Sequence, residues 1–236
     1  MGWKNVLEEV AEEFVENPLN FVTEDDVQVR LAHRLHEYLE ASDGESPFAE
    51  WRDPEFDYRH SMRYKQNYRK QMEEKLKDAG SIRRVHTEPT TRTTDEEGHN
   101  FVDVVVFRDH IDGVIEWTSS GSKRYPRDAI EVAIELKFVK NLRKPETPES
   151  GETARDTYLL KDIQSLRNRT AEGTTRYFFV VSLLDHLYVD DNHDPVEWKN
   201  EQYAEWGQQA QRWLADSAGD VQILYVTPMQ KTWLTD

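Results

Sequence analysis

A ten-residue alternating pattern between residues 130 and 139 constrains the fold more than any other feature of the sequence. Apolar side chains stand at every second position, at Ile130, Val132, Ile134, Leu136 and Phe138. A period of two predicts a β-strand with one face in the core. The other face carries Glu135 and Lys137, with Cα atoms about 7 Å apart. Because charges in an apolar strand are costly to desolvate without partners, this pattern predicts half of an active site, where a metal ion and a phosphate would use both charges.

Length and composition favour one soluble domain over residues 1–236. A chain of 236 residues with 37% hydrophobic content can bury one sizeable core. It has no run of 18 apolar residues, and its acidic N-terminus lacks the apolar region of a signal peptide. The absence of cysteine excludes disulfides and thiolate zinc sites, which leaves oxygen and imidazole as metal ligands. We therefore expect a cytoplasmic protein.

The formal net charge of −16 is large for this length, and the acidic pairs are scattered along the chain. Molar salt screens such self-repulsion, because the Debye length falls to about 3 Å. We therefore expect the acidic surface of a halophilic protein. The alternative is a DNA mimic, whose acidic surface would occupy the nucleic-acid groove of another protein.

The first half of the chain is predicted to be mainly helical. Apolar spacing predicts a helix over residues 4–16, and Thr23 with Asp26 forms a capping-box variant that opens a second helix through Leu39. We expect 42–58 to be a loop or a short irregular helix. A polar helix over 59–79 would follow and end at Gly80.

A basic stretch surrounds this polar helix. Between Arg59 and Arg92 ten cations face four anions, and three tyrosines are interleaved with them. The stretch can be a groove wall for a nucleic-acid backbone or a solvated helix that balances acidic neighbours. Both interpretations stay open.

The second half predicts strands alternating with helices. The first expected strand is 101–107, in which the charge of Asp103 is anomalous, and a turn at 109–113 leads to its hairpin partner at 114–117. Three further strands are expected at 129–139, at 177–184 as a central strand, and at 221–226 as the last strand. The expected helices are 153–169 and 197–216, and the expected loops are 89–100, 142–151 and 185–195.

Two consecutive predicted strands carry Asp103 and, after 31 intervening residues, Glu135-x-Lys137. This pattern resembles the PD-(D/E)XK nuclease superfamily over residues 22–185. Glu-x-Lys recurs at Glu73 and Glu197, but only Glu135 lies on a strand that follows an acid-bearing strand. Val102 stands where the name-giving motif has proline. The resemblance implies an α/β, restriction-endonuclease-like mixed sheet flanked by helices. An extra N-terminal helix and a C-terminal helix-strand addition over 197–226 would extend this core.

The resemblance also implies a metal site. Mg²⁺, for which Mn²⁺ can substitute, prefers hard oxygen ligands and lowers the pKa of a coordinated water. Asp103, Glu135 and the Leu136 carbonyl would hold it, and Lys137 would orient or deprotonate the attacking water and hold the scissile phosphate. Members often add an acid from the first core helix, which Glu24 matches, with Glu88 as a competing metal ligand.

A polar residue of the helix after the motif strand also faces the site in many members of this superfamily. Lys161, Asp162 and Gln164 are available for this role, and Gln164 is preferred.

The implied activity is hydrolysis of DNA phosphodiesters, with DNA as the partner, no membrane, and a homodimer as a compatible assembly. Restriction, repair and mobile-element defence all use this scaffold. The residues also have structural explanations. Glu135 and Lys137 can be the exposed face of an edge strand, Asp103 can begin a strand, Glu24 can favour the helix dipole, and Gln164 can simply face solvent. A nuclease-type fold without catalysis, which binds nucleic acid or protein, therefore remains an alternative.

Overall fold

The computed structural model describes residues 2–42, 44–51, 55–57, 66–91, 101–117, 123–139, 158–182, 201, 205, 208 and 211–235. The chain is mixed α/β, as predicted, and it divides into two compact units. The first unit comprises residues 1–31, 135–165 and 176–236, and the second comprises 32–134 and 166–175. Helix α2 (Glu24–Ala41), strand β10 (Ile130–Val139) and helix α4 (Tyr158–Arg169) each contribute residues to both units.

The first unit contains the predicted N-terminal helices and the strands of the second half of the chain. Its remaining elements are α1 (Trp3–Glu16), η1 (Pro18–Asn20), β11 (Thr175–Ser182), β12 (Val221–Val226) and β13 (Lys231–Trp233), and residues 211–217 are helical. The predictions of a helix over 4–16, a strand over 129–139 and a strand over 221–226 are confirmed. Strand β13 was not predicted.

The predicted capping box at the start of α2 is confirmed. The Asp26 carboxylate accepts the backbone N–H groups of Val22 and Thr23 at 2.8 Å, and the Thr23 hydroxyl accepts the N–H of Asp26 at 3.3 Å. These bonds satisfy backbone donors that have no partner within the helix. The box therefore fixes where α2 begins.

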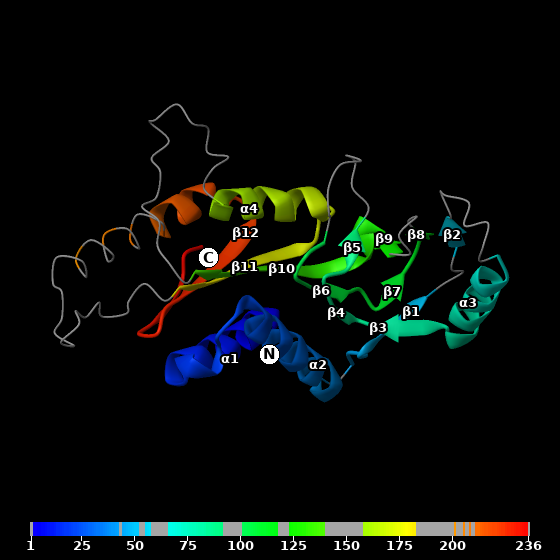
Figure 1. Ribbon diagram of the computed structural model, residues 1–236, viewed down its shortest axis with the longest axis horizontal. Coiled ribbons are helices and arrows are strands. Elements are labelled where there is room, and N and C mark those ends of the chain that lie inside the picture. The colour runs from blue at the N-terminus through cyan, green and yellow to red at the C-terminus, as the bar shows by residue number, and fades with distance from the viewer. Residues whose placement is uncertain are drawn as a thin grey trace, which may run out of the picture. The chain divides into compact units, whose positions relative to one another are not determined.

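The strands of the first unit follow the order β13-β12-β11-β10. Strands β11 and β12 are parallel, from Arg176 opposite Val221 to Val181 opposite Val226, and β13 is antiparallel to β12. In Figure 1, α1 lies on one side of these strands and α4 on the other. The Phe14 ring of α1 meets Phe138 of β10 edge-on, with ring centroids 6.5 Å apart. Alternation along β10 then directs Glu135 and Lys137 toward the α4 side.

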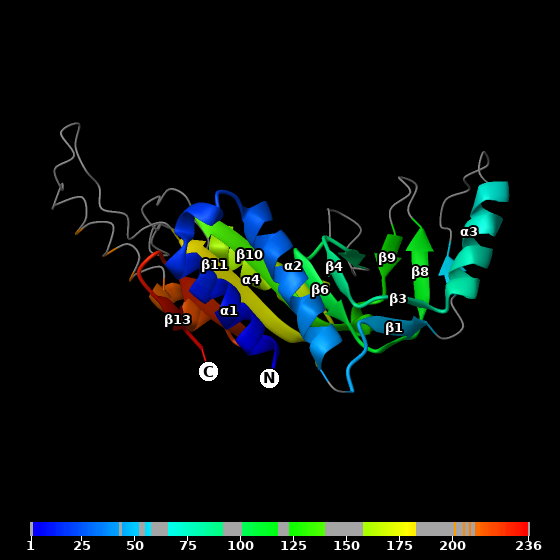
Figure 2. The same ribbon diagram turned by 90° about the horizontal axis from the view of Figure 1, so that it is seen from below.

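Helix α1 is bound to the hairpin that ends in β13, and the two lie side by side in Figures 1 and 2. The Trp233 indole N–H donates to Glu8 at 2.7 Å, and the Lys4 ammonium lies 4.4 Å from the centre of the Trp233 ring. Lys231 also forms an ion pair with Glu12. Because α1 buries its apolar face, these polar contacts orient a helix that packing already holds.

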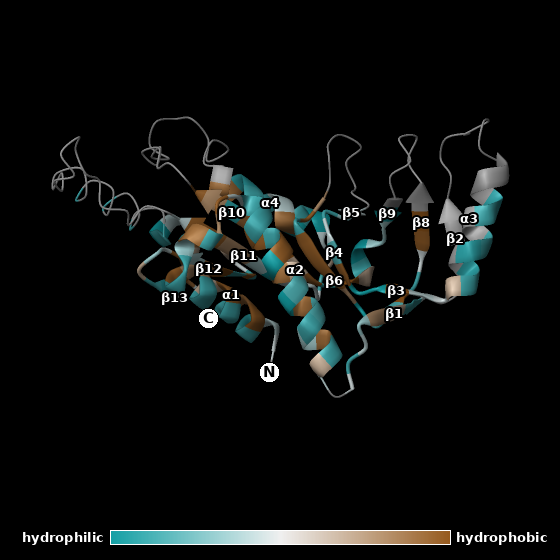
Figure 3. Cartoon of the chain, turned by 60° about the horizontal axis from the view of Figure 1, so that its bottom comes forward, coloured by the Kyte–Doolittle hydropathy of each residue, from teal (hydrophilic) through white to brown (hydrophobic). Residues whose placement is uncertain are grey.

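The second unit is built mainly from short strands. Its elements are β1 (Phe48–Trp51), β2 (Glu55–Asp57), α3 (Gln66–Ala79), β3 (Ser81–Arg83), β4 (Val85–Thr87), β5 (Thr90–Thr91), β6 (Val104–Phe107), β7 (His110–Ile111), β8 (Val114–Trp117), β9 (Lys123–Tyr125) and η2 (Arg127–Ala129). They form the strand orders β3-β1-β7, β2-β8-β9-β5 and β10-β6-β4. In Figure 3, β6 and β8 are mainly hydrophobic, as expected of buried strands.

Two predictions in this unit are wrong. Residues 42–58 contain β1 and β2, where a loop or an irregular helix was predicted. Ala49 and Trp51 alternate with exposed residues in a strand pattern, but the acidic residues around them obscure that pattern in the sequence. Residues 114–117 do not pair with the first motif strand. Strand β8 pairs with β2 and β9, while β6 pairs with β4 and β10. The strand predicted at 101–107 starts at Val104, so Asp103 directly precedes it.

Arg84, between β3 and β4, is the largest fully buried side chain of the described residues and is 1% exposed. Its guanidinium donates to the Glu45 carboxylate at 2.6 Å, to the Glu131 carboxylate at 2.5 Å and to the Phe107 carbonyl at 2.7 Å. A further bond of 3.2 Å reaches the Ser46 carbonyl. A buried charge requires such partners. Arg84 therefore joins β6, β10 and the segment before β1 within the second unit.

Several predicted segments lie partly or wholly outside the described residues. They are 59–65 of the polar helix, the loops 92–100, 142–151 and 185–195, residues 153–157, and most of 197–210. Within the described part, α3 ends at Ala79 before Gly80, which has φ +64°, as predicted. Among the helices that the structure describes, none combines the length and the apolar character that a membrane span requires.

Candidate functional site

The predicted motif strand places Glu135 and Lys137 within the first unit. Glu135 is 7% exposed, although it is a carboxylate, and Leu136 beside it is 2% exposed. The Lys137 ammonium lies 3.4 Å from the Asp162 carboxylate of α4, and the two side chains are 30% and 20% exposed. Lys137 of β10 therefore forms a half-buried ion pair with Asp162 of α4. The charged face of β10 lies under α4 and is not the open surface of an edge strand.

Glu24 reaches the same strand from the first turn of α2. Its carboxylate accepts the backbone N–H of Phe138 at 2.9 Å, a contact within the first unit. The prediction that an acid from this helix approaches the motif strand therefore has a structural counterpart, although the contact is with the backbone. Gln28 lies one turn further along and is 9% exposed. Its spacing of four from Glu24, beside the apolar stripe of Val27 and Leu31, was the available signal for this buried amide.

On α4 the residue that contacts the motif strand is Asp162, whereas the preferred candidate Gln164 and the neighbouring Lys161 are exposed. Positions two apart on a helix point about 200° apart, so Asp162 and Gln164 cannot share a face. Asp162 stands four residues before Leu166, which is buried. The apolar stripe therefore contained the signal that selects Asp162.

Asp103 and Glu88 belong to the second unit, and their backbones are hydrogen-bonded to each other. The Glu88 N–H donates to the Asp103 carbonyl at 2.9 Å, just after β4 and just before β6. Asp103 is half-buried and Glu88 is exposed. Glu88 has φ +49°, and it is the one residue other than glycine with positive φ among those described. Such a conformation costs about 1–2 kcal/mol for an L-residue.

The structure thus brings Glu24, Glu135, Lys137 and Asp162 into the first unit, and Asp103 and Glu88 into the second. A cation shared by Asp103 and Glu135 stays a prediction. Among the described residues, no group of three or more carboxylates and imidazoles is arranged to hold a metal ion. Mg²⁺ sites in proteins commonly use one or two carboxylates and several waters, so the donors of β10 suit this ion without such a group.

Neither models of known protein families, nor curated proteins, nor solved structures yield a match to this chain. The chemistry of the site is therefore argued from its residues alone.

Proposed function

We propose that the protein is a Mg²⁺-dependent deoxyribonuclease with a restriction-endonuclease-like core of the PD-(D/E)XK type. The observation that carries this proposal is the buried carboxylate of Glu135 on β10, two residues from the half-buried ammonium of Lys137. Burial of a carboxylate in an apolar strand is costly, and a cation is a partner that offsets this cost. A metal cation and an ammonium close together would stabilise the negative charge that develops during phosphodiester hydrolysis.

Strand pairing within the second unit supports the choice of Asp103. Val104 of β6 lies opposite Ile134 of β10 in the antiparallel register. Asp103 directly precedes Val104, and Glu135 directly follows Ile134. The proposal therefore assigns both carboxylates to one metal.

Each residue has a distinct role in this proposal. The carboxylates of Asp103 and Glu135 and the carbonyl of Leu136 would hold Mg²⁺, with Mn²⁺ as a substitute. The ion would supply charge neutralisation at phosphorus and a more acidic water. Lys137 would hold the scissile phosphate, and Asp162 would position the Lys137 ammonium through their ion pair. Glu24 would fix the end of β10 through the Phe138 N–H.

Cleavage of DNA in the presence of Mg²⁺ tests the proposal. Glu135→Gln and Lys137→Ala should each lower the cleavage rate by about a hundredfold or more, as expected for loss of a group that acts in the transition state. Glu16→Gln and Lys161→Ala are the matched controls, because both side chains are exposed and lie outside the site. Cleavage that survives both site variants would show that another protein cuts the DNA.

Metal binding provides an independent measurement. Mg²⁺ or Mn²⁺ should raise the melting temperature of the protein, because a ligand that binds only the folded state stabilises it. Glu135→Gln should reduce this rise, and Glu16→Gln should leave it intact. An unchanged rise in Glu135→Gln would remove Glu135 from the metal site.

A second function is a nuclease-type module that binds nucleic acid or protein without hydrolysis. It is favoured by the ion pair of Lys137 with Asp162, which already engages the ammonium that hydrolysis would use. DNA binding without cleavage in Mg²⁺ or Mn²⁺ would establish it. A protein that neither binds nor cuts DNA would fit the acidic DNA mimic.

A further inference from the structure

The hydroxyl of Ser182, at the end of β11, is buried and has no hydrogen-bond partner among the described residues. Ser182 is 0% exposed. Other buried hydroxyls of the described residues are bonded, since those of Thr170 and Thr174 donate to backbone carbonyls at 2.8 Å and 3.1 Å. Burial of a hydroxyl without a bond is unfavourable, and an enclosed water or a role in a functional site explains such exceptions.

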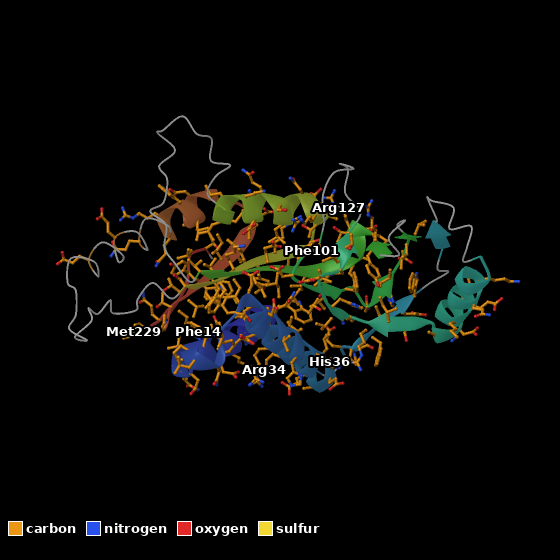
Figure 4. All side chains as sticks on the ribbon, viewed as in Figure 1. Phe14, Arg34, His36, Phe101, Arg127 and Met229 are labelled. Atoms are coloured by element: carbon orange, nitrogen blue, oxygen red, sulfur yellow. The ribbon has the colours of Figure 1, made fainter. Side chains whose placement is uncertain are left out.

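Ser182 lies on the α4 side of the strands of the first unit. Figure 4 shows side chains on both sides of these strands, toward α4 and, around Phe14, toward α1. The Tyr177 ring lies 6.0 Å from the Trp233 ring, whose N–H donates to Glu8 of α1. Tyr177 therefore faces α1. Because side chains alternate along a strand and the pairing of β11 with β12 is regular, Ser182, five residues later, faces α4.

Ser182 also stands at the level of the end of β10. Strands β10 and β11 are neighbours, and the Thr174 hydroxyl donates to the Ile130 carbonyl, so the two strands begin together and run parallel. Ser182 and Phe138 are each eight residues further along. An irregularity of β10 after Ile130 shifts this level by about one residue. Lys137, which precedes Phe138 and faces α4, is therefore a neighbour of Ser182.

The Lys137 ammonium has three N–H donors and needs several acceptors to hold it in one orientation. The Asp162 carboxylate is one partner, at 3.4 Å from the Lys137 nitrogen. A serine hydroxyl both accepts and donates, so it can join the same network without adding charge. One enclosed water can connect two buried polar groups that are too far apart to bond directly.

We propose that Ser182 is a positioning residue of the candidate site, whose hydroxyl binds one enclosed water that accepts a hydrogen bond from the Lys137 ammonium. Asp162 of α4 and Ser182 of β11 would then hold the ammonium from two separate elements. The importance of this link for hydrolysis rests on the proposed function. The link itself belongs to the protein without metal or substrate.

Urea unfolding in EDTA tests the link in a cycle of Ser182→Ala, Lys137→Met and the double variant. Ser182→Ala should raise the equilibrium constant for unfolding about fivefold, because the protein loses a water-mediated hydrogen bond. In the Lys137→Met background the same change should lower this constant, because the buried hydroxyl has already lost its partner. The change of sign measures the interaction between the two residues.

Two controls separate this interaction from general effects on folding. Lys161 is an exposed lysine of α4, so Ser182→Ala should have the same effect in Lys161→Met as in the unmodified protein. The Thr227 hydroxyl, just after the neighbouring strand β12, accepts the N–H groups of Met229 and Gln230 at 3.3 Å and 3.2 Å. Thr227→Val should therefore destabilise the protein by the same factor with and without Lys137→Met.

Cleavage of DNA in Mg²⁺ tests the role of the link in the reaction. Ser182→Ala should lower the turnover number about tenfold and leave KM unchanged, as expected for loss of a group that orients another side chain of the site. Thr227→Val should leave the turnover number unchanged at a temperature at which both variants are folded.

A more stable protein after Ser182→Ala alone, or an equal effect in the two lysine backgrounds, would overturn the link. An interaction in urea without any loss of turnover would overturn the positioning role. An interaction in urea in a protein that never cleaves DNA would refute the proposed hydrolysis and leave the link between Ser182 and Lys137 in place.

Discussion

Replacement of Arg84 by methionine should destabilise the protein by about 3 kcal/mol. Removing one partner of a buried ion pair typically costs about 3–5 kcal/mol, because it leaves the other charge uncompensated. The lower end applies, since the Glu45 and Glu131 side chains are 41% and 30% exposed and can regain water. Two backbone carbonyls, of Phe107 and Ser46, also lose their charged donor. Methionine has a similar volume, so the cost of a cavity stays small.

Urea unfolding measures this loss, provided that the dependence on urea concentration keeps its slope. The triple variant Arg84→Met/Glu45→Gln/Glu131→Gln should recover about half of the lost free energy of unfolding. It removes the two carboxylate charges that the Arg84 guanidinium had neutralised. The neighbouring Arg83→Met is the control. Arg83 is exposed and bonds to His36, so its loss should cost about 0.5 kcal/mol or less. A loss below about 1 kcal/mol in Arg84→Met, or no recovery in the triple variant, would refute the assigned role of Arg84.

Two other predictions concern alkaline pH and a helix cap. Burial raises the pKa of the Tyr125 hydroxyl above its ordinary value of 10.0. The unfolded chain therefore loses this proton at a lower pH than the folded protein does. The free energy of unfolding should consequently fall as the pH rises above about 10. Tyr125→Phe should make that fall shallower in urea titrations at pH 9 to 11, and an unchanged fall would assign it to other groups. Asp26→Ala should cost about 1 kcal/mol, because the N–H groups of Val22 and Thr23 lose their acceptor. Asp25→Ala, an exposed acid in the same turn, is its control, and equal losses in both variants would contradict the capping role.

Local patterns predicted the elements that depend on sequence periodicity alone. The alternation along β10, the apolar stripe of α1 and the capping box at Thr23 all encode their structure within a few residues. Strand partners depend on distant residues, and this is where the predictions were wrong. Residues 114–117 pair with β2, whose own sequence had been interpreted as a loop. No local signal distinguishes that partner from β6.

The candidate site shows the same division. The position of Glu135 and Lys137 on one face of a largely buried strand was predictable from the period of two. The choice of Gln164 over Asp162 ignored the phase of the α4 stripe, in which Asp162 stands beside Leu166.

The first unit is assembled from three separate stretches of the chain, so its core can close only after residues 176–236 have been synthesised. All residues of the second unit have been translated by residue 175, whereas the first unit lacks β11, β12 and β13 until residues 176–236 follow. The apolar face of α1 must therefore wait for its strands while most of the chain is made. During this interval a nascent chain with exposed Val6, Leu7, Val10 and Phe14 is a target for chaperones.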